Sequence, residues 1–119
     1  MRRRAITALV FVSLSACAHV SEPMQKVVAI TLEAPGLTAE QTEQSVAAPF
    51  EQALLTVQGV QHMRSSSTSG GFCRIELEFE SAPSQQMLQL VQTAALAAWQ
   101  QSAVKMAVPL VAIQDRSIP

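Results

Sequence analysis

Apolar and polar positions alternate in two stretches of the chain, and a period of two predicts strands with one buried face. The first stretch is residues 27–33 and the second is residues 72–80. In the second stretch the apolar positions, which should face the core, are Cys73, Ile75, Leu77 and Phe79, and the polar positions are Arg74, Glu76, Glu78 and Glu80. Residues 60–67 come before it across a segment with two glycines, which predicts a hairpin. Residues 108–113 form a last β-branched run, typical of a fourth strand.

Two other segments carry apolar residues at helical spacing. Thr38 and Gln41 form a capping-box pattern, so a helix should begin there and end near Gly59. Its apolar stripe is Val46, Phe50, Leu54 and Val57. Pro49 lies inside this segment and should bend or interrupt the helix. Residues 84–102 follow Pro83 and predict a second helix, with a stripe made of Met87, Val91, Ala94 and Ala98 beside Leu88 and Ala95.

The resulting order is βαββαβ over residues 27–115, which predicts an α+β, ferredoxin-like domain. In this arrangement two helices cover one face of a four-stranded antiparallel sheet, and we expect the other face to be exposed. The polar residues on that exposed face form a candidate partner-binding surface: Glu33, Arg74, Glu76, Glu78 and Glu80. The alternative is an acidic face that is simply solvated.

The start of the chain has the order of a secretory signal. Arg2, Arg3 and Arg4 precede an apolar run at residues 5–14, which is shorter than the roughly 20 residues that a membrane-spanning helix needs. Residues 14–17, Leu-Ser-Ala-Cys, resemble the lipobox of bacterial lipoproteins. The resemblance implies a signal peptide at residues 1–16, cleaved between Ala16 and Cys17, and a lipid on Cys17.

An acylated Cys17 would make the membrane the first partner of the mature chain, with residues 17–26 as a short tether. Position 18 is alanine, whereas an aspartate after the cysteine tends to retain such lipoproteins at the inner membrane. We therefore expect an outer-membrane lipoprotein of the cell envelope that faces the periplasm. The alternative is an ordinary secretory signal that happens to contain a cysteine.

Composition and charge narrow the classes of function. With 49% hydrophobic and 14% charged residues, the 119-residue chain should fold as one domain. Removing the three leader arginines leaves five basic residues against nine acidic ones. This acidic balance argues against nucleic acid as a partner, because phosphate binding needs clustered basic residues.

The sequence predicts neither catalysis nor a cofactor. His62 stands near Ser65, Ser66, Ser67 and Ser69, but no nucleophile-elbow pattern is present and Asp115 is the only aspartate. Soft metal ligands also occur, namely His62, Met63, Cys73 and Met106, without the spacing of a metal site. We interpret Cys73 and Met63 as core residues and expect Cys73 to be a buried, neutral thiol.

The ordered motifs of residues 27–113 resemble the first porter subdomain of resistance-nodulation-division efflux pumps. The resemblance runs from the Ala34-Pro35-Gly36 turn and the helix up to Leu54 through three further stretches: residues 57–60, residues 63–67 with Gly70-Gly71, and residues 75–79. It implies the βαββαβ fold. Such pumps use several porter subdomains and titratable residues in membrane helices, which residues 27–113 do not supply.

The resemblance implies an accessory module that contacts an efflux assembly, or its own copies, rather than a transporter. Two alternatives remain open. The first is an envelope lipoprotein that reuses the fold to bind a small ligand or a soft metal ion. The second is a decayed fragment of a pump gene.

Overall fold

The computed structural model describes residues 25–119. Four strands and a set of helices follow one another in the predicted order. Their bounds are β1 Lys26–Glu33, α2 Ala39–Thr42, the π-helix η1 Glu43–Ala47, α3 Ala48–Leu54, β2 Val60–Thr68, β3 Phe72–Phe79, α4 Gln85–Gln100 and β4 Leu110–Asp115. The predicted α+β fold, with a four-stranded antiparallel sheet and two helical segments on one of its faces, is therefore confirmed.

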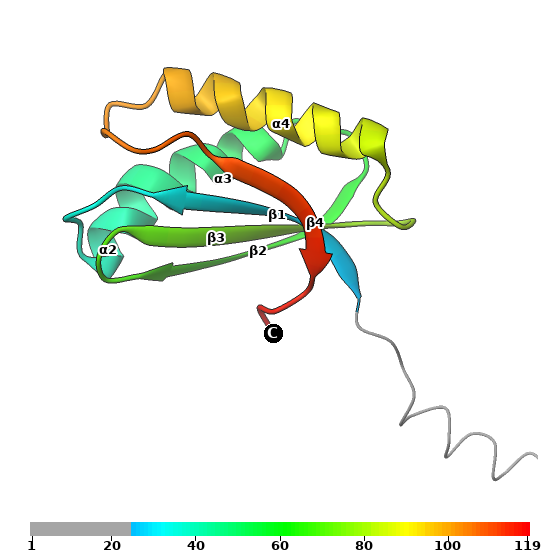
Figure 1. Ribbon diagram of the computed structural model, residues 1–119, viewed down its shortest axis with the longest axis horizontal. Helices are drawn as coiled ribbons and strands as arrows, with labels where there is room; N and C mark the ends of the chain where they lie inside the picture. The colour runs from blue at the N-terminus through cyan, green and yellow to red at the C-terminus, as the bar shows by residue number, and fades with distance from the viewer. Residues whose placement is uncertain (1–24) are drawn as a thin grey trace, which may run out of the picture.

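The sheet has the strand order β2-β3-β1-β4, and all its neighbours are antiparallel (Figure 1). Strand β1 pairs with β3 through Val28↔Leu77 and Ile30↔Ile75, and it pairs with β4 through Val28↔Ile113. The two strands that the alternating pattern identified, β1 and β3, thus form the centre of the sheet. Strands β2 and β4 form its edges.

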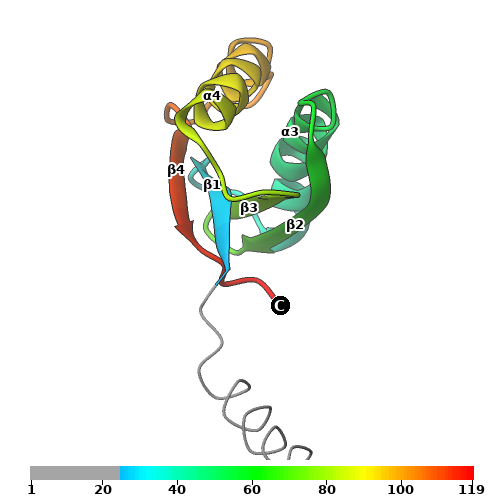
Figure 2. The ribbon, with the colours of Figure 1, turned by 90° about the vertical axis from the view of Figure 1, so that its right-hand side faces the viewer.

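The helical layer covers one face of the sheet, and the C-terminal residues lie against the other face (Figure 2). The core between the sheet and the helices contains most of the predicted apolar positions, whose buried side chains are Val28, Ile30, Leu32, Val46, Phe50, Leu54, Val57, Cys73, Ile75, Leu77, Phe79, Val91 and Ala95. The other residues of the stripe predicted for the second helix, Met87, Leu88, Ala94 and Ala98, are partly buried and pack against this core. Burying these apolar side chains supplies the main stabilisation of the domain.

The first helix begins with the predicted capping box. The Gln41 amide donates to Thr38 Oγ1 over 3.1 Å, and the Thr38 amide donates to Gln41 Oε1 over 3.0 Å. The interruption expected at Pro49 takes the form of the π-helix η1, in which the Ala48 amide donates to the Glu43 carbonyl. Proline cannot donate to the carbonyl four residues earlier, so a wider turn just before Pro49 keeps the chain helical.

The β2–β3 hairpin turns at two glycines that pack against the end of β1. Gly70 and Gly71 have φ angles of 94° and 87°, which favour glycine. The Ala34 amide donates to the Gly71 carbonyl over 2.8 Å. A Cβ atom on Gly71 would lie 1.7 Å from the Ala34 carbonyl oxygen, so residue 71 must lack a side chain.

Strand β4 begins later than the sequence predicted. The expected strand covered residues 108–113, whereas β4 spans Leu110–Asp115. Pro109 has no amide hydrogen for a ladder, and the Ala107 amide donates to the Glu33 carbonyl as the chain enters the sheet. At the other end Gln114 and Asp115 stay paired with Val27 and Lys26, which extends the strand.

The predicted signal peptide, the cleavage site at Ala16 and the acylated Cys17 lie outside the described residues. Of the predicted tether at residues 17–26, only Gln25 and Lys26 belong to the part that the structure describes, and Lys26 is already the first residue of β1. Within residues 25–119, no helix combines the length and the apolar character required to cross a membrane.

Candidate functional site: the open face of the sheet

The face of the sheet that points away from the helices, here called the open face, carries most of the predicted partner-binding residues. Arg74, Glu76 and Glu78 alternate with the core positions of β3, and Glu33 lies at the end of β1. Glu80 comes after the last residue of β3 and is exposed. The alternating pattern therefore assigned these side chains of β3 to the correct face.

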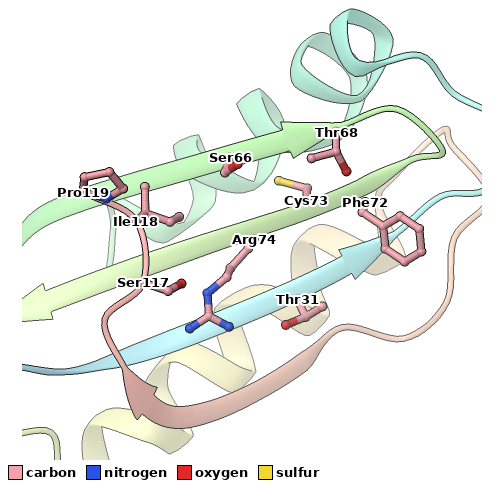
Figure 3. A pocket seen from close by; sticks show the side chains of 9 residues that line it. All are labelled: Thr31, Ser66, Thr68, Phe72, Cys73, Arg74, Ser117, Ile118 and Pro119. Carbon is pink, nitrogen blue, oxygen red and sulfur yellow. The ribbon is translucent and has the colours of Figure 1, made fainter. Parts of the chain in front are cut away.

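The centre of the open face is not exposed, which corrects the sequence-based expectation. Glu76 is fully buried with 0% of its surface exposed, and Val27 and Ala29 beside it are buried as well. The cover is the segment of residues 116–119, here called the strap, which crosses the face after β4 (Figure 3). A partner could reach only the part of this face that the strap leaves free.

Glu76 holds the strap in place through several hydrogen bonds. Its Oε2 atom accepts from the Ser117 amide over 2.9 Å and from the Ser117 hydroxyl over 2.8 Å. Its Oε1 atom accepts from the Ile118 amide over 3.1 Å. The Arg74 guanidinium also donates to Oε2, over 2.7 Å, so the buried carboxylate has a cationic partner and three further donors. Such a network satisfies a charge that would otherwise be costly to bury.

The hydrogen bonds also set the ionisation of Glu76. Burial alone would raise the pKa of its carboxyl group, but the donors on Arg74, Ser117 and Ile118 together outweigh burial and lower this pKa to about 2. Glu76 is therefore an anion at neutral pH. The network requires this state, because each of these groups donates a hydrogen to the carboxylate.

Three more polar contacts surround the network. The Arg64 guanidinium donates to Glu78 Oε1 over 2.8 Å, and Gln25 also donates to the Glu78 carboxylate. These contacts, the one from Arg64 first, lower the pKa of Glu78. The Arg116 amide donates to the Gln25 carbonyl over 2.8 Å, so the strap is also tied to the residue just before β1.

A shallow hollow of about 350 Å³ lies between the strap and the hairpin end of the open face. Figure 3 shows its lining residues: Thr31, Ser66, Thr68, Phe72, Cys73, Arg74, Ser117, Ile118 and Pro119. Phe72 is the most exposed large apolar residue among them, with 49% of its surface exposed. The hollow thus combines an apolar wall with hydroxyl groups and one guanidinium. It can receive a small group that has both apolar and hydrogen-bonding parts.

Cys73 is a buried, free cysteine, as the sequence predicted. Burial is the main reason that its pKa is raised to about 11, the hydrogen bond with Ser67 acts in the opposite direction, and Glu43 and Glu51 add to the rise. In the folded protein we expect alkylation of Cys73 by iodoacetamide at pH 8 to be at least about 100-fold slower than in denaturant, because thiolates are the reactive species. Peptide mass spectrometry after timed quenching measures both rates, and equal rates would contradict the buried position.

The soft ligands and the serines noted in the sequence do not gather at one point. His62 and Ser66 lie opposite Glu78 and Arg74 in the β2–β3 register, which places them on the open face. Ser65 and Ser67 lie opposite Ile75 and Cys73 and therefore face the helices. Among residues 25–119, no group of three or more histidine, cysteine or acidic side chains is arranged to hold a metal ion.

The fold defines a ferredoxin-like domain, and comparisons with known proteins add its porter-like class. A sequence model of the AcrB/AcrD/AcrF family matches residues 8–114. The chain therefore belongs to the AcrB/AcrD/AcrF family. The search of curated proteins finds no sequence match.

Solved structures share the fold. One of them, described as the X-ray crystal structure of a heavy metal efflux pump, is similar with a TM-score of 0.63 at 24% sequence identity. The similarity covers 92% of this chain and 12% of that chain. The present chain thus spans a small part of the length of the pump, which agrees with the resemblance to a single porter subdomain.

Proposed function

We propose that this chain is a lipid-anchored accessory domain of the cell envelope that binds a component of an efflux assembly. The observation that carries the proposal is the combination of family membership with a single porter-type unit, since residues 25–119 contain one βαββαβ domain. Such a unit can dock on other proteins. It offers no membrane helix within the described residues through which an ion gradient could drive transport.

Lipid anchoring is the first part of the proposal to test. The lipobox-like residues 14–17 support it, although the family match begins at residue 8, inside the predicted signal peptide. We expect intact-mass spectrometry of the membrane-extracted protein to show a chain that begins at Cys17 and carries acyl groups. A Cys17→Ser variant should lack this mass addition. A mass that matches the unmodified chain from Met1 would contradict the proposal.

Binding to an efflux component is the second part. The exposed portion of the open face, near Phe72 and Glu33, is the surface that we propose for this contact, since the strap covers the rest. Affinity purification of the tagged full chain from membranes should recover efflux components, and Phe72→Ser should reduce the recovery at least about fivefold, as expected for an exposed aromatic anchor. Leu55→Ser is the control, because Leu55 is 63% exposed and lies at the end of α3, outside this surface.

A second candidate function is the binding of a small ligand, which the hollow beside Phe72 favours. In this version the domain is an envelope lipoprotein whose role is unrelated to export. Titration calorimetry of the full chain with copper, silver and zinc ions tests the soft-metal form of this candidate. Heat that disappears in a Cys73→Ser variant would support it, and the absence of heat at micromolar protein would remove it.

A further inference from the structure

One side of the domain carries almost no charge. Between Ser81 and Gln114, which include all of α4 and most of β4, Lys105 is the only charged residue. Helix α4 lies on the surface and yet has no acidic or basic side chain along its length. Surface helices normally carry charges on the face that water contacts, and protein interfaces are the surfaces from which charges are depleted.

The uncharged side includes an edge strand whose outer backbone is unpaired. In the part of the chain that the structure describes, β4 pairs only with β1. The other edge strand, β2, is polar in sequence, has a register irregularity between Val60 and His62, and carries the Arg64–Glu78 ion pair. Charges and irregularities of this kind protect an edge from further pairing. Strand β4 lacks them from Leu110 to Gln114.

Apolar side chains are exposed along this edge. Leu110 is 69% exposed and Val108 is 52% exposed, and Leu96 on α4 and Ile113 on β4 are partly exposed beside them. A groove of about 270 Å³ lies between α4 and β4 and is lined by Gln92, Ala95, Leu96, Val108, Pro109 and Val111. An unpaired strand and an apolar groove therefore lie side by side on the uncharged face.

We propose that two copies of this chain pair through β4 in antiparallel orientation, with Ala112 at the two-fold axis. The distribution of charge favours a second copy of this chain as the molecule that binds the β4 edge. The domain is acidic, and its other helical face carries Glu40, Glu43 and Glu51, so two copies would repel each other there. The α4–β4 face is the surface on which like-charged copies can meet without repulsion. This inference rests on the proposed function in one respect: it assumes that the domain acts by binding other protein chains.

The register follows from the sequence of β4. With Ala112 at the axis, Val111 lies opposite Ile113 of the second copy, and Leu110 lies opposite Gln114 of the second copy. Ile113 and Val111 point to the helical side of the sheet, so Ile113 of each copy would enter the groove beside Val111 of the other. Pro109 ends the ladder at one end. The charged residue at the other end, Asp115, then faces Pro109 of the second copy.

A matched pair of lysine substitutions tests the interface. Leu110→Lys places a charge on the proposed edge, and Leu55→Lys changes a leucine of similar exposure, 63% against 69%, far from β4. We expect the full chain in detergent, and its Leu55→Lys variant, to sediment as dimers. Leu110→Lys should raise the dimer dissociation constant at least about tenfold, because edge lysines oppose strand pairing. Circular dichroism verifies that both variants are folded.

Cross-linking tests the register. In an Ala112→Cys variant the two introduced thiols should react with a short bismaleimide to give a covalent dimer, since residues opposite each other in antiparallel strands have Cβ atoms about 5 Å apart. Ser66→Cys places the thiol on the other edge strand and should give none. A monomeric full chain at micromolar concentration, or equal cross-linking of both variants, would overturn the proposal. Recovery of efflux components by the Leu110→Lys variant is a separate readout, so failure of pairing and failure of the proposed function are distinguishable.

Discussion

Replacing Glu76 by alanine is expected to lower the free energy of unfolding at pH 7 by about 2–4 kcal/mol. The substitution removes the acceptor of four hydrogen bonds and leaves the guanidinium of Arg74, with its partly buried position, without its anionic partner. It also loosens the strap, because the backbone amides of Ser117 and Ile118 donate their hydrogen bonds to this carboxylate. Urea denaturation followed by circular dichroism measures the change.

The control for this substitution is Glu80→Ala. Glu80 is exposed and follows the end of β3, so its removal should change the free energy of unfolding by less than about 0.5 kcal/mol. A similar loss of unfolding free energy in both variants would show that the effect at Glu76 comes from the change in net charge and not from the hydrogen-bond network. An unchanged stability of Glu76→Ala would contradict the buried network itself.

Glu76 should also make the domain sensitive to acid. Its pKa is about 2 in the folded state against an ordinary value of 4.5, so the unfolded state binds the proton more tightly. The stabilisation from Glu76 is therefore complete above about pH 5 and is lost as the pH falls towards 2, by an amount of roughly 3 kcal/mol. In Glu76→Gln this part of the pH dependence should disappear, so the stability curves of the two proteins should converge at low pH. Parallel curves from pH 7 to pH 2 would contradict the assignment.

Gly71→Ala is the second substitution with a large expected effect, a loss of at least about 3 kcal/mol of unfolding free energy. The residue has a φ angle of 87°, which alone disfavours a side chain, and the new Cβ atom would overlap the Ala34 carbonyl oxygen at 1.7 Å. The hairpin would have to move away from the end of β1. Thermal and urea unfolding of the purified variant measure the loss.

Gly70→Ala provides the matched control. Gly70 has a similar φ angle of 94°, but a Cβ atom there would meet only the ring of Phe72 at 3.6 Å, an ordinary contact distance. Its loss should therefore be limited to the backbone strain of about 1–2 kcal/mol. The difference between the two variants isolates the steric effect at Ala34. Equal losses would mean that strain alone accounts for both.

The fold was predictable because its signals are local. Alternation in residues 72–79 identified both the strand and its buried side, and the capping box at Thr38 identified the start of the first helix. Pro49 indicated an interruption, although its form as a π-helical turn depends on how the helix packs on the sheet. The start of β4 was wrong by two residues, because residues 108 and 109 have strand-like neighbours but the entering loop is fixed by a hydrogen bond to Glu33.

The site was less predictable than the fold. Periodicity places Glu76 on the open face, but its burial depends on Ser117 and Ile118, which lie 41 and 42 residues further along the chain. No local pattern connects a strand carboxylate to a segment without regular structure. The one indication of this burial is the position of Glu76 in the middle of a central strand, between neighbours that are buried.

The position of β1 has a mechanical consequence. The chain enters the domain at the first residue of this strand, which is hydrogen-bonded on both sides, to β3 and to β4. A force transmitted through residue 25 acts along the strand axis and must therefore shear two ladders of hydrogen bonds together instead of opening one ladder bond by bond. The bond from Arg116 to Gln25 adds a further tie at the point where the load enters. A pull along β1 from residue 25 would therefore load both ladders of the central strand at once.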